Sequence, residues 1–441
     1  MGSQLVDQQS RTRIKTELQR NQLVEAGAGS GKTQMMAERM AAGIASGAYV
    51  VEHMAAVTFT RKAAAELRGR FQLALEQELN DAGQDNERLA RVRLALSNIE
   101  RFFAGTIHSF CAHLLRERPV EAGVSPGFTE LDEVEDQRLR RQSWRDYRSQ
   151  LKAAGDPLML EIIEAGLKPT DLDRAFDTVC LFDEVDFPGG DAQRPDATAP
   201  WAELDTFWKT LQRRLPASID PDTTCKIQER ARKFQGQWRV AEMHRGQARA
   251  LVGLLETWDG ASKIIQKWWS DDAKEKKQIA VEVTALHEAF CSGVVEPFLR
   301  QWRQYVYRLS VALLTKARDY AAGERRRLNT LNYGDLLQMA AQVLRENADV
   351  RRALGEKYRW VFVDEFQDTD PVQAEIMFLL SSEGKPESGS ADWRTVALRP
   401  GALFVVGDPK QSIYRFRRAD IDIWTRTRSG KTRSARRVCI R

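Results

Sequence analysis

The sequence has few cysteines, and none of them are close together. Its five cysteines are scattered singly along 441 residues. No pair has the spacing of a zinc site, a redox motif or an iron–sulfur site, so we expect neither a metal cluster nor a disulfide framework. A chain without disulfides suits a reducing compartment, and we expect a cytoplasmic protein.

Long apolar runs are also missing. No stretch approaches the roughly 20 apolar residues of a transmembrane helix, so we expect no membrane partner. Residues 1–20 are polar and mixed in charge, unlike a secretory signal peptide. Hydrophobic residues make up 42% of the chain and charged residues 29%, which is ordinary for a soluble globular protein. The length suits two or three domains.

The net charge of +5 is unevenly placed. Residues 410–441 carry +9, which leaves −4 on the rest of the chain. A basic end on a mildly acidic body suggests an anionic partner near that end. A solvated basic tail is the plainer alternative.

Short apolar runs alternate with helical patterns at both ends of the chain. The runs that we expect to form strands are residues 22–25, 54–59, 102–104, 358–363 and 402–406. Helical patterns follow the first three, at residues 32–46, 61–79 and 107–116. This alternation is typical of parallel βαβ units. Residues 130–327 are instead mostly helical in pattern and hold eight of the 11 tryptophans, so we expect a helical insertion that packs most of them as core.

A glycine-rich turn follows the first predicted strand. It consists of Ala26, Gly27, Ala28, Gly29, Ser30, Gly31, Lys32 and Thr33. Small residues let a backbone wrap a triphosphate with its N–H groups inward, and the following helix adds a favourable dipole. Lys32 is expected to reach the β- and γ-phosphates, and the Thr33 hydroxyl to bind Mg²⁺. Ala26 stands where the strict pattern has glycine, and an incidental strand–helix turn is the alternative.

A pair of acids, Asp364 and Glu365, ends the fourth predicted strand. Ligands of parallel sheets bind at this end of the strands. Asp364 is expected to hold Mg²⁺ together with Thr33, and Glu365 to orient or deprotonate the attacking water. A helix N-cap before Pro371 would explain one acid, but not a buried strand that leads into two.

The fifth predicted strand is followed by Gln411 and a basic, aromatic segment. A glutamine here can hydrogen-bond the γ-phosphate or the attacking water without adding charge, and can therefore distinguish ATP from ADP. Tyr414 and Phe416, beside Arg415, have the composition of a base-stacking surface with phosphate contacts. Buried aromatic rings at an exposed basic turn are the alternative.

Together these segments resemble superfamily 1 helicases of the UvrD/Rep type, and among them the RecB/AddA branch. The segments that resemble the family's motifs are residues 24–33, 57–67, 105–110, 332–337, 364–369 and 406–417. The resemblance covers about residues 20–118 and 330–420, with the motifs in the family's order.

The resemblance implies an α/β fold, a RecA-like P-loop NTPase whose parallel sheet is flanked by helices and interrupted by a helical insertion. Residues 1–118 and 330–424 would form the two parts of this motor domain. Residues 119–329 would form the insertion. Residues 425–441 have no apolar period, and we expect a basic tail without regular structure, or a truncated end.

The resemblance also implies an ATP-dependent 3′–5′ DNA helicase of recombination and repair, which uses ATP and Mg²⁺ at the bacterial nucleoid. Its partners would be single-stranded DNA and a second helicase or nuclease subunit. The residues implied in DNA contact are Phe59, Thr60, Arg61, Thr106, His108, Tyr414, Arg415 and Phe416.

Three departures from the family keep alternatives open. Gln8, Gln9 and Arg11 compete for the place of the glutamine that reads adenine, and Arg418 stands where a small residue is usual. The family's second motor domain, with both arginine fingers, has no counterpart in these 441 residues. A non-hydrolysing module for ATP and single-stranded DNA, or a fragment of an exonuclease V-like complex, are therefore alternatives. The DNA-stacking aromatic residues argue against a P-loop kinase or a transporter ATPase.

Overall fold

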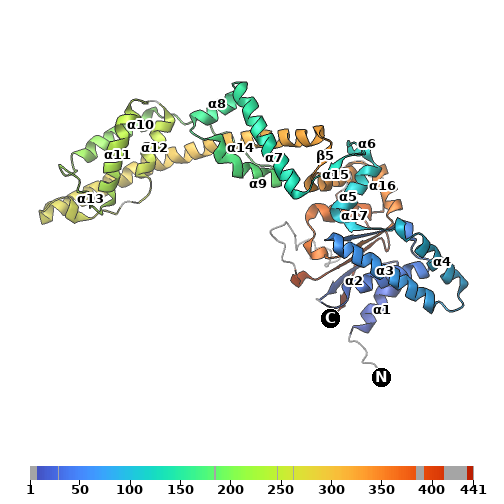
Figure 1. Cartoon of the computed structure of the whole chain (residues 1–441). Helices are drawn as coiled ribbons and strands as arrows, with labels where there is room; N and C mark the ends of the chain where they lie inside the picture. Colours follow the sequence, from blue (N-terminus) through green and yellow to red (C-terminus); the bar gives the residue numbers. More distant parts are fainter. Residues whose placement is uncertain are drawn as a thin grey trace. The chain divides into compact units, whose positions relative to one another are not determined.

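The computed structural model of the chain describes residues 7–27, 29–182, 185–245, 247–261, 263–383 and 392–411, and the backbone of residues 435–440. The chain divides into two compact units (Figure 1). Unit 1 comprises Met1–Glu133 and Arg326–Arg441, and unit 2 comprises Val134–Arg325. The predicted insertion, residues 119–329, begins earlier and ends later than unit 2.

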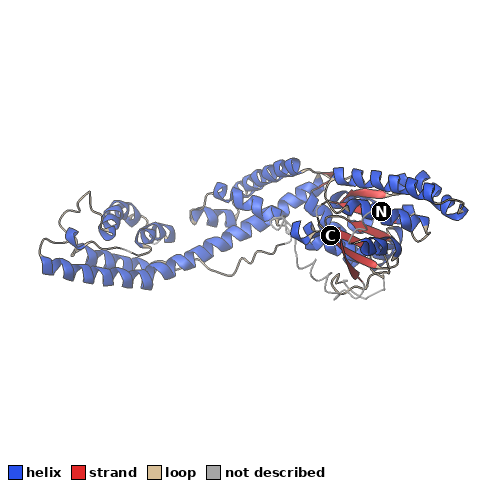
Figure 2. Ribbon diagram, turned by 90° about the horizontal axis from the view of Figure 1, so that it is seen from below, coloured by secondary structure: helices blue, strands red, loops and turns tan. Residues whose placement is uncertain are grey.

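Unit 1 is built on a parallel sheet, drawn in red in Figure 2. Its six strands have the order β3-β2-β6-β7-β1-β8. In that order the strands are Phe103–Thr106, Met54–Thr58, Trp360–Val363, Leu403–Gly407, Asn21–Ala26 and Ala435–Ile440. The four middle strands are almost wholly buried. Parallel strands that are covered on both faces have continuous apolar sequences, and this is why the apolar runs predicted these strands.

Helices cover both faces of this sheet (Figure 1). The helices of unit 1 are α1 (Gln8–Thr16), α2 (Lys32–Ala45), α3 (Arg61–Asp81), α4 (Asn86–Ser97), α5 (Ile107–Glu117), α6 (Pro119–Ala122), α15 (Tyr333–Glu346), α16 (Ala348–Lys357) and α17 (Pro371–Leu380). Alternate strand residues go to opposite cores, since Val361 packs with α5, α15 and α17, and Phe362 with α2 and α3. The predicted α/β fold is confirmed. A short parallel pair, β4 (Thr129–Glu130) and β5 (Thr330–Leu331), lies next to the chain boundaries of unit 2.

The predicted lack of structure in residues 425–441 is wrong for the last strand. Residues 435–440 form β8, in register with β1 from Asn21↔Ala435 to Ala26↔Ile440. The pairing uses backbone hydrogen bonds, which any sequence without proline can make. The tail therefore needed no apolar period to become the edge strand of the sheet.

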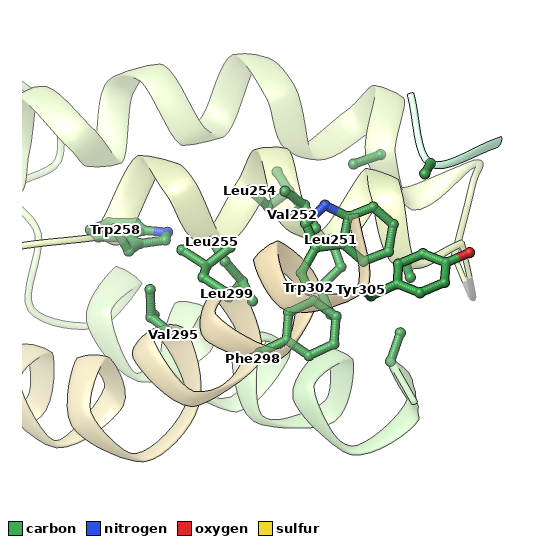
Figure 3. Close-up of a cluster of buried hydrophobic side chains, with 14 of the residues drawn as sticks. Leu251, Val252, Leu254, Leu255, Trp258, Val295, Phe298, Leu299, Trp302 and Tyr305 are labelled. Atoms are coloured by element: carbon green, nitrogen blue, oxygen red, sulfur yellow. The ribbon is translucent and has the colours of Figure 1, made fainter. Parts of the chain in front are cut away.

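The regular elements of unit 2 are all helices over the residues that the structure describes (Figure 2). Its helices are α7 (Glu133–Ala153), α8 (Pro157–Glu164), α9 (Asp173–Leu181), α10 (Thr198–Gln212), α11 (Lys226–Glu242), α12 (Ala248–Trp258), α13 (Ala273–Phe290) and α14 (Glu296–Arg327). Figure 3 shows part of its core, where Leu251, Leu255 and Trp258 from α12 face Leu299 and Trp302 from α14. Unit 2 thus has an apolar core of its own.

Most tryptophans of the insertion are core residues, as we expected. The buried ones are Trp144, Trp201, Trp208, Trp258, Trp269 and Trp302. Trp268 and Trp269 are neighbours in different surroundings, because Trp269 is buried and Trp268 is partly exposed. Trp268 ends the 3-10 turn Gln266–Trp268, and Trp269 is its C-cap.

None of the helices in the described part of the chain combines the length and the apolar character needed to cross a membrane. The four cysteines whose side chains the structure describes, Cys111, Cys180, Cys225 and Cys291, are buried and form no disulfide with one another.

Candidate functional site

The glycine-rich turn joins the end of β1 to the start of α2. Gly29 and Gly31 have φ angles of +72° and +81°, a backbone region that residues with a Cβ seldom adopt. Gly31 is the N-cap of α2 and provides no side-chain cap, so the first N–H groups of the helix remain available to an anion. Ser30 donates from its hydroxyl to the Gly27 carbonyl (2.7 Å). Ala28 lies outside the described residues.

Two side-chain contacts join this turn to the acids at the end of β6. Lys32 Nζ lies 3.3 Å from Glu365 Oε2. The Thr33 hydroxyl donates to Asp364 Oδ2 at 3.4 Å. The four residues come from segments more than 330 positions apart, and β7 lies between their strands. The predicted phosphate and Mg²⁺ residues are therefore next to one another in space.

The surroundings of Asp364 oppose its charge. Burial, followed by the nearby charge of Glu365, raises the pKa of Asp364 to about 6. Lys32 and Thr33 act in the opposite direction. Burial also raises the pKa of Asp368. A buried carboxylate with a hydroxyl beside it is a suitable oxygen donor set for a hard divalent cation, which would restore the stability of the charged form.

Glu365 has an unusual backbone conformation. Its φ angle is +53°, and its N–H donates to Asp364 Oδ1 at 3.0 Å. Left-handed backbone in a residue other than glycine costs on the order of 1–3 kcal/mol and is concentrated at functional sites. The turn directs the chain from β6 into the 3-10 segment Phe366–Asp368.

The end of β7 supplies the third part of the site. Gln411 ends a 3-10 turn, and its N–H donates to the Asp408 carbonyl at 2.9 Å. Asp408 Oδ1 accepts from the N–H of Lys410 at 3.0 Å. We assigned no role to Gln367 from the sequence, although it lies inside the carboxylate motif. In the structure Gln367 contacts both Glu365 and Asp408.

Helix α1 lies against the glycine-rich turn. Arg11 donates to the Ser30 carbonyl at 3.1 Å and pairs with Asp7 at 3.0 Å. Gln8 and Gln9 are exposed. Gln8, Gln9 and Arg11 were the three candidates for reading adenine. Of these, Arg11 contacts the glycine-rich turn.

The first predicted DNA segment lies at the end of β2. Phe59 is exposed over 42% of its surface, and Arg61 is an exposed first residue of α3. The Thr60 hydroxyl is the N-cap of α3, where it accepts from the N–H of Ala63 at 3.1 Å. Capping accounts for the threonine at this position without any DNA contact.

The second predicted DNA segment lies on the neighbouring strand β3, since Thr58 is in register with Thr106. Thr106 caps α5 by accepting from the N–H of Ser109 at 3.2 Å. The ring of His108 lies 4.6 Å from that of Tyr333, whose surface is 39% exposed. Burial lowers the pKa of His108 to about 4, so the ring is neutral at physiological pH.

A small pocket lies between the predicted DNA segments and the acids. Its lining includes Phe59, Ile107, Asp364, Glu365 and Thr369. The remaining predicted DNA residues, Tyr414, Arg415 and Phe416, lie outside the described residues, as does Arg418.

Comparison with known proteins identifies the family of the chain. A family model for the UvrD/REP helicase N-terminal domain matches residues 6–430. The chain belongs to this family. The family that the motifs indicated is thereby confirmed.

Similar curated proteins are bacterial, and each is named as one subunit of an ATP-dependent helicase/nuclease. The chain is 29% identical to the one from Desulfitobacterium hafniense over 92% of its own length and 32% of that protein. It is 27% identical to the one from Levilactobacillus brevis, over 91% of this chain and 34% of the relative. For the one from Pediococcus pentosaceus, the identity is 25% over the same shares. The chain thus spans about a third of the length of the curated relatives it matches.

Proposed function

We propose that this chain is the ATP-binding motor part of a 3′–5′ DNA helicase of recombination and repair. The observation that carries the proposal is the meeting of Lys32 and Thr33 with Asp364 and Glu365 in one site. A phosphate loop that contacts strand-borne acids is the arrangement used by P-loop nucleoside triphosphatases.

Each residue then has a defined task. The N–H groups at the start of α2 and the ammonium group of Lys32 bind the phosphates. Thr33 and Asp364 would hold Mg²⁺, which supplies positive charge to the phosphate oxygens when bound. Glu365 accepts a proton from the attacking water as the bond between the γ-phosphorus and the ADP oxygen breaks, giving ADP and phosphate. Gln411, which ends the turn after β7, contacts the γ-phosphate or the water.

Single-stranded DNA is the proposed partner at the ends of β2 and β3. Phe59 exposes a ring on which a base can stack, and Arg61 offers a cation for a phosphate. Tyr414, Arg415 and Phe416 are proposed to add to this surface on the evidence of their sequence alone. The relatives are named as parts of a helicase/nuclease with more than one component, which supports a further protein partner, a second helicase or nuclease chain. Their bacterial origin supports action on DNA in the cytoplasm.

A non-hydrolysing module that binds ATP and single-stranded DNA is the second candidate. It rests on the same phosphate loop and on the exposed Phe59 and Arg61, since binding of both ligands needs no turnover. ATP hydrolysis by the purified chain, measured with and without single-stranded DNA, separates the two. Stimulation by DNA supports the motor. Binding of a fluorescent nucleotide without turnover supports the module. If the chain neither binds nor hydrolyses nucleotide, both proposals are wrong.

DNA binding is tested by fluorescence anisotropy at two salt concentrations. Each phosphate contact to a single strand contributes a slope of about −0.7 in log affinity against log salt. Arg61→Ala is therefore expected to make the slope shallower by about that amount, whereas Arg93→Ala, an exposed position on α4, leaves it unchanged. Tighter binding to duplex than to single strand would contradict the stacking role of Phe59.

A further inference from the structure

Gln367 is a buried amide that connects the ends of two neighbouring strands. Its surface is only 4% exposed. Nε2 donates to Glu365 Oε2 at 2.7 Å, and Oε1 accepts from the backbone N–H of Asp408 at 2.8 Å. Nε2 also lies 3.3 Å from Asp368 Oδ2. One side chain thus contacts the acid that follows β6 and the turn that follows β7.

The orientation of this amide follows from its partners. A backbone N–H can only donate, so the atom facing Asp408 must be the carbonyl oxygen. The NH₂ group then faces the carboxylate of Glu365, which can accept. The flipped amide would set donor against donor and oxygen against oxygen. The Gln367 side chain is therefore held in a single orientation.

The shared oxygen of Glu365 gives Gln367 a particular importance. Glu365 Oε2 is contacted by both Lys32 Nζ and Gln367 Nε2. Lys32 is assigned to the phosphates, which draw its ammonium group away from the acid. Gln367 accepts a hydrogen bond from the N–H of Asp408, after β7, and therefore remains in place to donate to Glu365. As a neutral donor, it fixes the direction of the carboxylate without supplying a counter-charge.

We propose that Gln367 is a positioning residue that sets the direction of the Glu365 carboxylate and links it to the turn carrying Gln411. The inference rests on the proposed ATP hydrolysis. The link runs from Glu365 through the Gln367 amide to the N–H of Asp408, and the carbonyl of Asp408 accepts from Gln411. A displacement of the β7 turn, which leads into the predicted DNA-binding segment, would be transmitted to the acid that activates water.

The test compares Gln367→Met, which keeps the length of the side chain but removes both hydrogen bonds, with Gln342→Met. Gln342 is exposed on α15 and donates to Glu346, so it is a matched control. Hydrolysis is followed under single-turnover conditions with protein in excess, which makes slow rates measurable. We expect Gln367→Met to lower the hydrolysis rate about 10- to 100-fold, a part of what a general base contributes. The Kd for a fluorescent ADP with Mg²⁺ should stay within about twofold, and Gln342→Met should change neither quantity.

A double-mutant cycle distinguishes positioning from general support of the fold. In a Glu365→Gln background there is no carboxylate to direct, so adding Gln367→Met should slow hydrolysis by less than about threefold. The inference is overturned if Gln367→Met slows hydrolysis as much in the Glu365→Gln background as in the wild type, or if the single variant hydrolyses ATP at the wild-type rate. It is also overturned if Gln367→Met weakens nucleotide binding as much as it slows hydrolysis. Gln367→Asn, which keeps the amide but is too short to span both partners, is expected to behave like Gln367→Met and serves if the methionine variant does not fold. A wild-type chain that neither binds nor hydrolyses nucleotide would instead overturn the proposed function itself.

Discussion

At the scale of single residues, Lys32 and Glu365 contact each other and yet are assigned different tasks. Lys32→Ala removes a charge-assisted phosphate contact, so nucleotide affinity should fall about 10- to 100-fold. Glu365→Gln keeps the shape and loses the base, so hydrolysis should fall about 10²- to 10⁴-fold with affinity nearly unchanged. Titration of a fluorescent nucleotide beside a single-turnover assay measures both. Equal losses of affinity in the two variants would contradict the assignment.

The burial of His108 should make the free energy of unfolding depend on pH. Its pKa is about 4 in the folded chain, against about 6.5 for a histidine exposed to water, so the unfolded chain binds more protons between these values. Stability should therefore fall as the pH drops from about 6.5 to about 4, by at most about 3 kcal/mol from this group. Urea denaturation at several pH values tests this. His108→Gln should flatten the decline in that window, and an unchanged slope would show that His108 is not its source.

At the scale of elements, a single arginine holds α1 beside the glycine-rich turn. Arg39 on α2 is fully buried and donates to the carbonyl oxygens of Ile14, Leu18 and Arg20, with distances between 2.6 and 3.2 Å. These carbonyls end α1 and lead into β1. The phosphate loop therefore follows a segment whose exit from α1 is fixed from within the core.

Arg39→Met should destabilise unit 1 by about 2–4 kcal/mol, because it leaves several buried carbonyl groups without a donor. Urea denaturation measures the change, and limited proteolysis should show earlier cleavage at α1. Arg13→Met, at an exposed position on α1 itself, is the control and should have little effect. A stability equal to that of the wild type would mean that α1 is held by its apolar contacts alone.

At the scale of the whole molecule, the two units have separate apolar cores. Leu255→Ala removes a fully buried side chain from the core of unit 2 and should destabilise that unit by about 2–5 kcal/mol. Nucleotide affinity should be unchanged, because the phosphate loop and the acids lie in unit 1. Tryptophan fluorescence during unfolding reports mainly on unit 2, which holds eight of the 11 tryptophans. A loss of nucleotide affinity in this variant would show that the units are energetically coupled.

Local sequence determined the parts of the fold that depend on short-range patterns. The buried strands appeared as apolar runs, and the observed strand Leu403–Gly407 lies one residue from the predicted range. Helix α5 was expected at residues 107–116 and is Ile107–Glu117. The glycine-rich turn was recognisable from its composition, and in the structure Gly29 and Gly31 have the positive φ angles that glycine adopts readily. Motif order along the chain was also enough to indicate the family.

Only the tertiary structure decided which residues meet. Nothing local in the sequence shows that Gln367 reaches Asp408, 41 positions away, because that contact depends on β6 and β7 being neighbours in the sheet. The strand β8 was missed for the same reason, since it is stabilised by backbone pairing with β1 and not by its own pattern. Thr60 and Thr106 were expected to contact DNA, and the structure shows each of them as a helix cap, which depends on where each helix begins. A sequence records residue types and spacing, whereas pairing between distant segments is set by the packing of the whole sheet.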